Sequence, residues 1–409
     1  MKSKYSGISL VLLILLLLVS CLPRSGDKNQ DRRMDDPDAR AGEMEAWQDT
    51  MELKRGLERQ SAFEYYVYAS AETTPVQSAE GEDAADDPAI WVNRKDPEKS
   101  LVLGTNKTRG INVYDLLGNE LQKMNIGMVN NIDLREGFQY RENEVVLVAA
   151  SNRSINAISI MVLDPLSGRL SDTIANLTAG VDEVYGLCCY HQQDPDVYFV
   201  FVNGKGGLVE QWKISGIGEN GAQASTLRKS EIQGVMVRSF QLSSQPEGMV
   251  ADDSKGLLYI GLEQEGIIVV SADPGEEVES SMLPGSDGSN PSIYFDIEGL
   301  ALFSIRGKDY LIASIQGNFS YAIFRLGAEA AYLGSFIIKE ALVDGAEETD
   351  GLDLALGAFS SRFPEGIFVV QDGFNTDGDM KRNQNFKYVS FSPIRKMIEA
   401  MEDAHASGL

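Results

Sequence analysis

The stretch EDAADDPAIWV, residues 82–92, contains four carboxylates followed directly by a run of apolar residues. Carboxylates this close together repel one another, so they must face water or share a cation. The apolar run after Pro88 is typical of a buried β-strand. The same succession of a polar group and an apolar run recurs along the chain, and this recurrence indicates the fold.

Two short sequence elements repeat. The first is the polar group before an apolar run, and its six copies are Asp87–Ile90, Asn131–Leu134, Tyr185–Leu187, Glu247–Met249, Glu298–Leu300 and Asp350–Leu352. The second closes the next apolar run, and its six copies are Thr105–Lys107, Ser151–Arg153, Asn203–Lys205, Leu262–Gln264, Ile315–Gly317 and Gln371–Gly373. A spacing of about 45–60 residues suits a blade of four antiparallel strands. The sequence therefore predicts an all-β protein, a six-bladed β-propeller with four-stranded antiparallel blades.

The repeat also predicts where these polar residues lie. In an antiparallel meander the start of the first strand and the end of the second lie on the same face. We therefore expect all copies to meet at one end of the central channel. The second-strand ends carry Lys107, Arg153 and Lys205 in the first three copies and Glu263, Gln316, Gln371 and Asp372 in the last three. One half of the face should be cationic and the other rich in carboxylates.

The starts of the first strands add further acids to this face: Asp86, Asp87, Asp133, Glu247, Asp296, Glu298 and Asp350. Carboxylates among amide and carbonyl oxygens favour Ca²⁺, whereas the two histidines of the chain make zinc unfavourable. Lysine and arginine on the other half suit phosphate, which needs divalent ions to offset the acids around it. Any one of these carboxylates could instead accept hydrogen bonds within a turn. Their shared register is what favours a site.

The composition limits the possible partners. The formal net charge of −25 disfavours nucleic acid, whose phosphates are bound by lysine and arginine. Such a charge is compatible with solvation in salt or with the binding of cations. Cys188 and Cys189 are adjacent, which strains a disulfide between them, so we expect buried thiols and a stability that comes from the apolar core.

The N-terminus resembles that of a bacterial lipoprotein. Lys2 and Lys4 precede the apolar run 8–19, which is too short to cross a bilayer as a helix. Residues 18–21, LVSC, then resemble a lipobox, in which Cys21 is lipidated. The alternative is an anchor that is not cleaved. Both predict an exported protein held at a membrane, at the cell surface or in the periplasm, and Leu22 favours the outer membrane where a cell has one.

These patterns divide the chain into a signal peptide at residues 1–20, a tether at 21–61, the propeller at 62–392, and a helix with a tail at 393–409. The helical spacing of Met44, Trp47 and Met51 favours a short helix in the tether. Ser392 and Pro393 suit the start of the last helix.

Several motifs closely resemble the bacterial β-propeller phytases and occur in the order of that family. They are residues 83–92, Thr105–Lys107, Asn130–Arg135, Ala149–Ser154, Glu183–Gly186, Glu247–Asp253, Asp296–Leu300, Thr349–Gly351 and Gly366–Gly373. The resemblance runs from about residue 71 to residue 391. It implies a calcium-dependent enzyme that hydrolyses phytate, inositol hexakisphosphate. It also implies phytate or calcium-phytate as the partner, a monomer, and a role in phosphate scavenging. We expect direct attack of metal-activated water without a phosphoenzyme, because no histidine is a plausible nucleophile.

The resemblance also implies roles for individual residues. The residues expected to take part in catalysis and to contact the hydrolysed phosphate are Lys107, Arg153, Tyr185, Lys205 and Glu263. Substrate binding falls to Arg109, Asn130 and Gln316. Several Ca²⁺ ions are expected at Glu72, Asp86, Asp87, Asn131, Asp133, Glu247, Asp296, Glu298, Asp350, Gln371 and Asp372.

Three positions depart from the pattern of the family. Thr108, followed by Arg109, stands where a second lysine is common, and Leu262 stands where an acid commonly precedes the residue that matches Glu263. Thr74 stands where another acid is expected, and the longer segment after Glu72 makes the match there weaker. Two alternatives stay open: a binding propeller that uses calcium only for rigidity, and a propeller lactonase, which would have no use for the three cations.

Overall fold

The computed structural model describes residues 51, 53–79, 81–216, 232–378 and 380–407, and the chain divides into a unit of residues 1–55 and a unit of residues 56–409. The described residues of the first unit are helical, and so are residues 56–60 of the second. Cys21, Met44 and Trp47 lie outside the described residues. Among the helices that are described, none is both long and apolar enough to cross a membrane.

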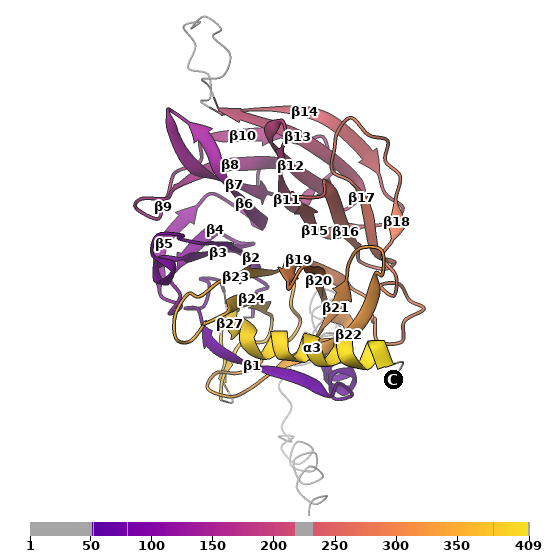
Figure 1. The fold of residues 1–409 in the computed structure, drawn as a ribbon. Helices are drawn as coiled ribbons and strands as arrows, with labels where there is room; N and C mark the ends of the chain where they lie inside the picture. The colour runs from indigo at the N-terminus through magenta and orange to yellow at the C-terminus, as the bar shows by residue number, and fades with distance from the viewer. Residues whose placement is uncertain (1–50, 52, 80, 217–231, 379, 408–409) are drawn as a thin grey trace, which may run out of the picture. The chain divides into compact units, whose positions relative to one another are not determined.

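The second unit consists mainly of antiparallel sheets, which Figure 1 shows arranged around a common centre. One sheet contains β2 (Ala85–Trp91), β3 (Leu101–Asn106), β4 (Gly110–Tyr114) and β5 (Glu120–Asn125). The next contains β6 (Val129–Tyr140), β7 (Asn143–Asn152), β8 (Ala157–Asp164) and β10 (Ala175–Thr178), with the short β9 (Arg169–Leu170) paired with β8. The third contains β11 (Val184–Gln193), β12 (Asp196–Gly204), β13 (Leu208–Gly216) and β14 (Ile232–Gln241). The fourth contains β15 (Pro246–Asp252), β16 (Leu257–Leu262), β17 (Gly266–Ser271) and β18 (Ser281–Met282).

Eight further strands form one sheet. Its order is β19 (Ile297–Ile305), β20 (Lys308–Ile315), β21 (Ser320–Arg325), β22 (Ala331–Lys339), β1 (Tyr65–Glu72), β27 (Asn385–Ser390), β24 (Gly366–Asp372) and β23 (Leu352–Leu356). Only β22 and β1 pair in parallel among these strands, so two runs of four antiparallel strands are joined at that pair. The structure thus supports a propeller-like arrangement of four-stranded sheets. It differs from the expected separate blades because β1, which lies outside the repeats, pairs with β22 along one edge and with β27 along the other.

Short elements complete the unit. They are β25 (Thr376–Asp377), β26 (Met380–Lys381), the 3-10 helices η1 (Pro97–Lys99) and η2 (Gln316–Asn318), and helix α3 (Phe391–Ser407). Helix α3 begins at Phe391, which is buried in the apolar core together with Ile394 and Ile398. The helix expected from residue 393 is therefore present and starts two residues earlier.

Five apolar clusters of the described chain join neighbouring sheets, and a sixth packs the two halves of the eight-stranded sheet against each other and against α3. One of them joins Ile90 and Val102 of the first sheet to Ile367 and Tyr388 of the eight-stranded sheet. This contact closes the ring, because it packs the last strands of the chain against the first. Cys188 and Cys189 are free and buried, as the sequence predicts.

The strand register brings the two repeated sequence elements together. The first residue of each first strand pairs at or near the end of the following strand, as Ala85 does with Asn106 and Val129 with Asn152. Five of these pairs then shift register, at residues 86–87, 130–131, 185–186, 247–248 and 298–299. Extra residues in a strand redirect its side chains, and these shifts coincide with the polar residues of the first element.

Glycine follows the polar residue in four copies of the first element because neighbouring first strands approach closely there. A Cβ atom on Gly186 would overlap the carbonyl group of Glu247. The amide of Gly299 donates a hydrogen bond of 2.7 Å to the Asp350 carbonyl. The other two close approaches are those of Gly248 to Glu298 and of Gly351 to Asp86. Each first strand in this part of the ring therefore contacts the next one.

Candidate active site

Glu247, in the register shift of β15, is central to a group of acids at the shared end of the strands. One carboxylate oxygen of each of Glu247, Glu263 and Glu298 lies within 4.8 Å of the others. Burial, and then the charge of Glu247, raises the pKa of Glu298 well above its ordinary value and that of Glu263 to about 7. Glu298 Oε2 is buried without a hydrogen-bond partner. This group fits a hard divalent cation, which would relieve the repulsion and occupy the unsatisfied oxygen.

Lys107, at the end of β3, forms a second group with three acids. Its Nζ lies 2.6 Å from Asp83, 2.8 Å from Asp350 and 3.6 Å from Asp86. Burial alone would lower the pKa of Lys107, but these carboxylates raise it well above its ordinary value, so the ammonium group stays charged.

Asp86 is the least satisfied acid of this group. Neither of its buried carboxylate oxygens has a hydrogen-bond partner, and burial raises its pKa well above the ordinary value despite the charge of Lys107. Burial also raises the pKa of Asp350 to about 7. One lysine therefore leaves part of the negative charge uncompensated, and this position too fits a cation.

The remaining cations connect to Glu247 through polar side chains. Lys205 Nζ lies 4.7 Å from the centre of the Tyr185 ring, and the Tyr185 hydroxyl is hydrogen-bonded to Glu247. Burial, and then the charge of Glu247, raises the pKa of Tyr185, so its hydroxyl keeps its proton. Arg153 pairs with Glu183, and its Nη1 lies 3.5 Å from Asn130 Oδ1. Asn130 Nδ2 in turn lies 3.4 Å from Glu247 Oε1.

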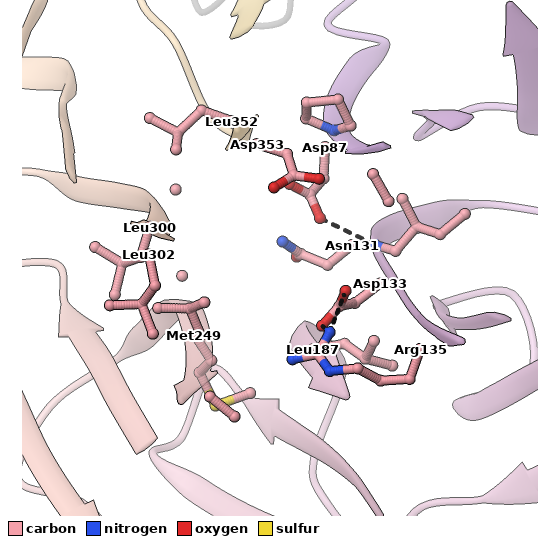
Figure 2. A pocket seen from close by; sticks show the side chains of 17 residues that line it. Asp87, Asn131, Asp133, Arg135, Leu187, Met249, Leu300, Leu302, Leu352 and Asp353 are labelled. Atoms are coloured by element: carbon pink, nitrogen blue, oxygen red, sulfur yellow. Dashed lines mark hydrogen bonds and ion pairs between the residues drawn. The ribbon is translucent and has the colours of Figure 1, made fainter. Parts of the chain in front are cut away.

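Asp87, Asn131 and Asp133 line a cavity of about 190 Å³ between the first strands, together with Arg135 and Asp353. Figure 2 shows Asp87, Asn131 and Asp133 across the cavity from Met249, Leu300 and Leu302. Asp87 Oδ2 accepts from the Ile132 amide at 3.0 Å, and Asp133 Oδ2 accepts from the Cys189 amide at 2.7 Å. These acids therefore connect neighbouring sheets, and unlike Asp86 they have hydrogen-bond partners.

Glu72 and Asp372 lie in a different ion-pair group. Both surround the fully buried Lys387, whose Nζ is 2.6 Å from Glu72 and 3.1 Å from Asp372 and also contacts Asp344. Burial raises the pKa of Asp372 to about 6, although Lys387 opposes this. The structure thus places these two predicted metal ligands around a lysine rather than beside Glu247.

The other predicted residues lie at the edges of these groups. Gln316 Nε2 donates to Asp350 Oδ1 at 2.7 Å, and Gln371 Oε1 accepts from the Asp350 amide at 2.9 Å. Asp296 accepts from Gln264. Arg109 is exposed, and its Nε donates to the Gln77 carbonyl at 3.1 Å. Through Asp350, Gln316 and Gln371 join the group around Lys107.

The sequence did not single out Asp353, Asp344 or Lys387. Asp353 accepts from the Ile90 amide at 2.7 Å and so connects the eight-stranded sheet to the first one. Its signal was a further acid three residues after Asp350. For Lys387 the signal was a charged residue between Phe386 and Tyr388 in β27.

The fold and the site define a propeller-like protein whose acids with unsatisfied oxygens could hold divalent cations beside lysine and arginine groups that suit anionic ligands. The model of the family described as Phytase matches residues 51–407. The chain therefore belongs to the phytase family. It is 40% identical over 348 residues to a 3-phytase of Bacillus subtilis (strain 168), over 83% of this chain and 87% of that protein.

Two solved structures show weaker similarity. The crystal structure of BBS1N in complex with ARL6DN, soaked with mercury, has a TM-score of 0.39 at 12% identity and covers 74% of this chain and 76% of that one. A functionally unknown protein from Desulfotomaculum acetoxidans DSM 771 has a TM-score of 0.39 at 16% identity and covers 63% and 74%. These scores are too low to support any conclusion about this chain.

Proposed function

We propose that this member of the phytase family hydrolyses phytate to lower inositol phosphates and free phosphate with the help of several bound Ca²⁺ ions. The observation that carries the proposal is the carboxylate group of Glu247, Glu263 and Glu298, of which Glu247 and Glu298 are buried. It is connected to Lys205 through Tyr185 and to Arg153 through Asn130. The similarity to a 3-phytase supports the choice of substrate.

Calcium would be held by the acids whose charge is least compensated: Glu247, Glu263, Glu298, Asp86 and Asp350. When bound, calcium offsets their charge, attracts phosphate and lowers the pKa of a water that attacks phosphorus. The departure at Leu262 does not remove this group, because Glu263, the next residue, supplies the carboxylate. The remaining predicted ligands, Glu72, Asp87, Asn131, Asp133, Asp296, Gln371 and Asp372, stay proposals for further ions.

The cations of the chain would bind and orient the phosphate. Lys107 stays protonated and Arg153 carries a permanent charge, so both can balance the negative charge of the phosphoryl oxygens in the transition state. The Tyr185 hydroxyl keeps its proton and provides a hydrogen bond next to Lys205. Their fixed ion pairs and hydrogen bonds place these groups before substrate arrives, which reduces the cost of reorganisation.

The proposal includes the architecture and the cellular location. The eight-stranded sheet is counted as two blades joined by the pair β22–β1, which gives six blades. The six apolar clusters agree with this count, because one of them lies between these two blades. The chain is a monomer that is exported and anchored to a membrane through Cys21, where it releases phosphate for uptake. The lipobox and the tether support this location.

An assay of phosphate release from phytate, beside hydrolysis of a lactone, tests the proposal. The full chain should release phosphate in calcium and lose this activity after exhaustive treatment with a chelator. Stability that rises with calcium without any phosphate release would indicate a binding propeller instead. Hydrolysis of the lactone alone would indicate a lactonase.

A further inference from the structure

Residues 56–60 form the helical start of the second unit and contact a double loop in the eight-stranded sheet. One part of the double loop is residues 294–296, before β19, and the other is residues 316–319, which include η2. The two parts pack backbone against backbone: the Gln316 amide donates to the Asp296 carbonyl at 2.9 Å, and a Cβ atom on Gly317 would overlap the Phe295 carbonyl.

Arg59 contacts both parts of the double loop. Its Nη1 donates to the Gly317 carbonyl at 2.8 Å, and its guanidinium carbon lies 4.3 Å from the centre of the Tyr294 ring. Many arginines of this acidic chain pair with a carboxylate, as Arg94 does with Glu136, but Arg59 has no carboxylate partner among the described ion pairs. The interactions described for Arg59 are those with the double loop.

Two neighbours of Arg59 reinforce this contact. Gln60 Nε2 lies 3.3 Å from the Phe319 carbonyl, and Gly56 packs directly against the Phe319 ring, where a Cβ atom would overlap it. Phe319 has a φ of 52°, in the left-handed region of backbone conformation that residues other than glycine rarely adopt. Contacts from residues 56–60 therefore hold a strained turn in place.

The double loop carries two residues of the candidate active site. Gln316 donates to Asp350, which pairs with Lys107, and Asp296 accepts from Gln264 beside Glu263. A displacement of the loop would therefore change the positions of groups on both halves of the face.

We propose that Arg59 is a positioning residue of the active site. It holds residues 294–296 and 316–319 together through its contacts with Tyr294 and Gly317. In this way it fixes Gln316 and Asp296 in the geometry that the metal and the phosphate require. The inference rests on the proposed function for its effect on catalysis, but its effect on the loop and on calcium binding does not depend on turnover.

The experiment compares the full chain with Arg59→Ala and Arg59→Lys. Arg94→Ala is the matched control, because it removes an exposed arginine from the turn between β2 and β3, at the opposite end of the strands from Lys107. Amide hydrogen exchange of residues 316–320 is measured in chelator. Calcium binding is measured by calorimetry, and kcat and KM are measured with phytate as the substrate. Loss of a charged hydrogen bond and a cation–π contact corresponds to about a tenfold change in the equilibrium for opening of the loop and in the equilibrium for calcium binding.

Arg59→Ala should raise exchange at residues 316–320 and the half-saturating calcium concentration by about tenfold each, with a lower kcat. Arg59→Lys should restore part of each effect, and Arg94→Ala should match the parent chain. Unchanged exchange, or a half-saturating calcium concentration that is unchanged or lower, would overturn the inference. The lower value is expected if Arg59 only repels calcium by its charge. Absence of turnover in the parent chain would refute the proposed function alone.

Discussion

Asp350 provides a test in which one substitution has opposite effects with and without calcium. Burial raises its pKa to about 7, Lys107 opposes this rise, and the charges of Asp83 and Glu247 add to it. The ordinary pKa is 3.8, and a difference of about three pH units corresponds to about 4 kcal/mol of destabilisation by the ionised form. A folded-state pKa above the unfolded value means that this cost is fully present above pH 7 and disappears as the pH falls toward 4.

In chelator at pH 8, Asp350→Asn should therefore raise the free energy of unfolding by about 2–4 kcal/mol, where the lower limit allows for the weaker interaction with Lys107. At pH 5 the gain should be smaller, because Asp350 is then already protonated in the folded chain. In saturating calcium the sign should reverse, since a ligand that stabilises the folded state by mass action is lost.

Urea unfolding at both pH values, with chelator and with calcium, measures these four differences. Asp172→Asn, in the exposed loop before β10, is the control and should change none of them. Equal destabilisation by Asp350→Asn with and without calcium would show that Asp350 is a structural acid and not part of a metal site.

Three further outcomes are expected. Arg153→Ala should lower kcat for phytate by about 10²–10³ and leave the thermal midpoint within about 2 °C, because it removes a charge that acts on the transition state. Steady-state kinetics and thermal unfolding measure these two effects. A normal kcat would contradict the role of Arg153 in the transition state. Gly248→Ala should destabilise the fold by about 2–3 kcal/mol, because the new Cβ atom would overlap the Glu298 carbonyl. The control is Gly288→Ala, whose Cβ atom would make only ordinary contacts. Equal urea midpoints for the two variants would contradict the close approach of the sheets. Burial raises the pKa of Glu263 to about 7, so calcium binding near pH 6.5 should release a proton from the parent chain that is not released from Glu263→Gln. Calorimetry in buffers of different ionisation enthalpy measures this proton release. Equal proton release by the parent chain and by Glu263→Gln would exclude Glu263 as a ligand.

Where residues follow the repeat, the sequence predicted the end of the strands at which they lie. Each polar group of the first element precedes an apolar run, and this pattern alone placed Asp86, Glu247, Glu298 and Asp350 at the same end of their strands. For Asp86, Glu247 and Glu298 a register shift accompanies the pattern, because these residues occupy the extra positions of their strands. Asp350 lies just before β23, which pairs with β24 without a shift.

The sequence could not predict contacts that depend on segments outside the repeat. The parallel pairing of β1 with β22 joins two sheets and follows from the position of the N-terminal strand, which no repeat describes. The ion pairs of Lys387 with Glu72 and Asp344 join residues that are far apart in sequence, so neither partner indicates the other. Arg59 acts through the backbone carbonyl of Gly317, a contact that leaves no pattern of side chains.

The most direct test of the account is to locate calcium in crystals of the full chain by anomalous X-ray scattering. We predict a calcium ion coordinated by Glu247, Glu263 and Glu298, and a second one that contacts Asp86 or Asp350. Anomalous density that avoids both groups in crystals saturated with calcium would contradict the central claim that the carboxylate half of this face is a metal site.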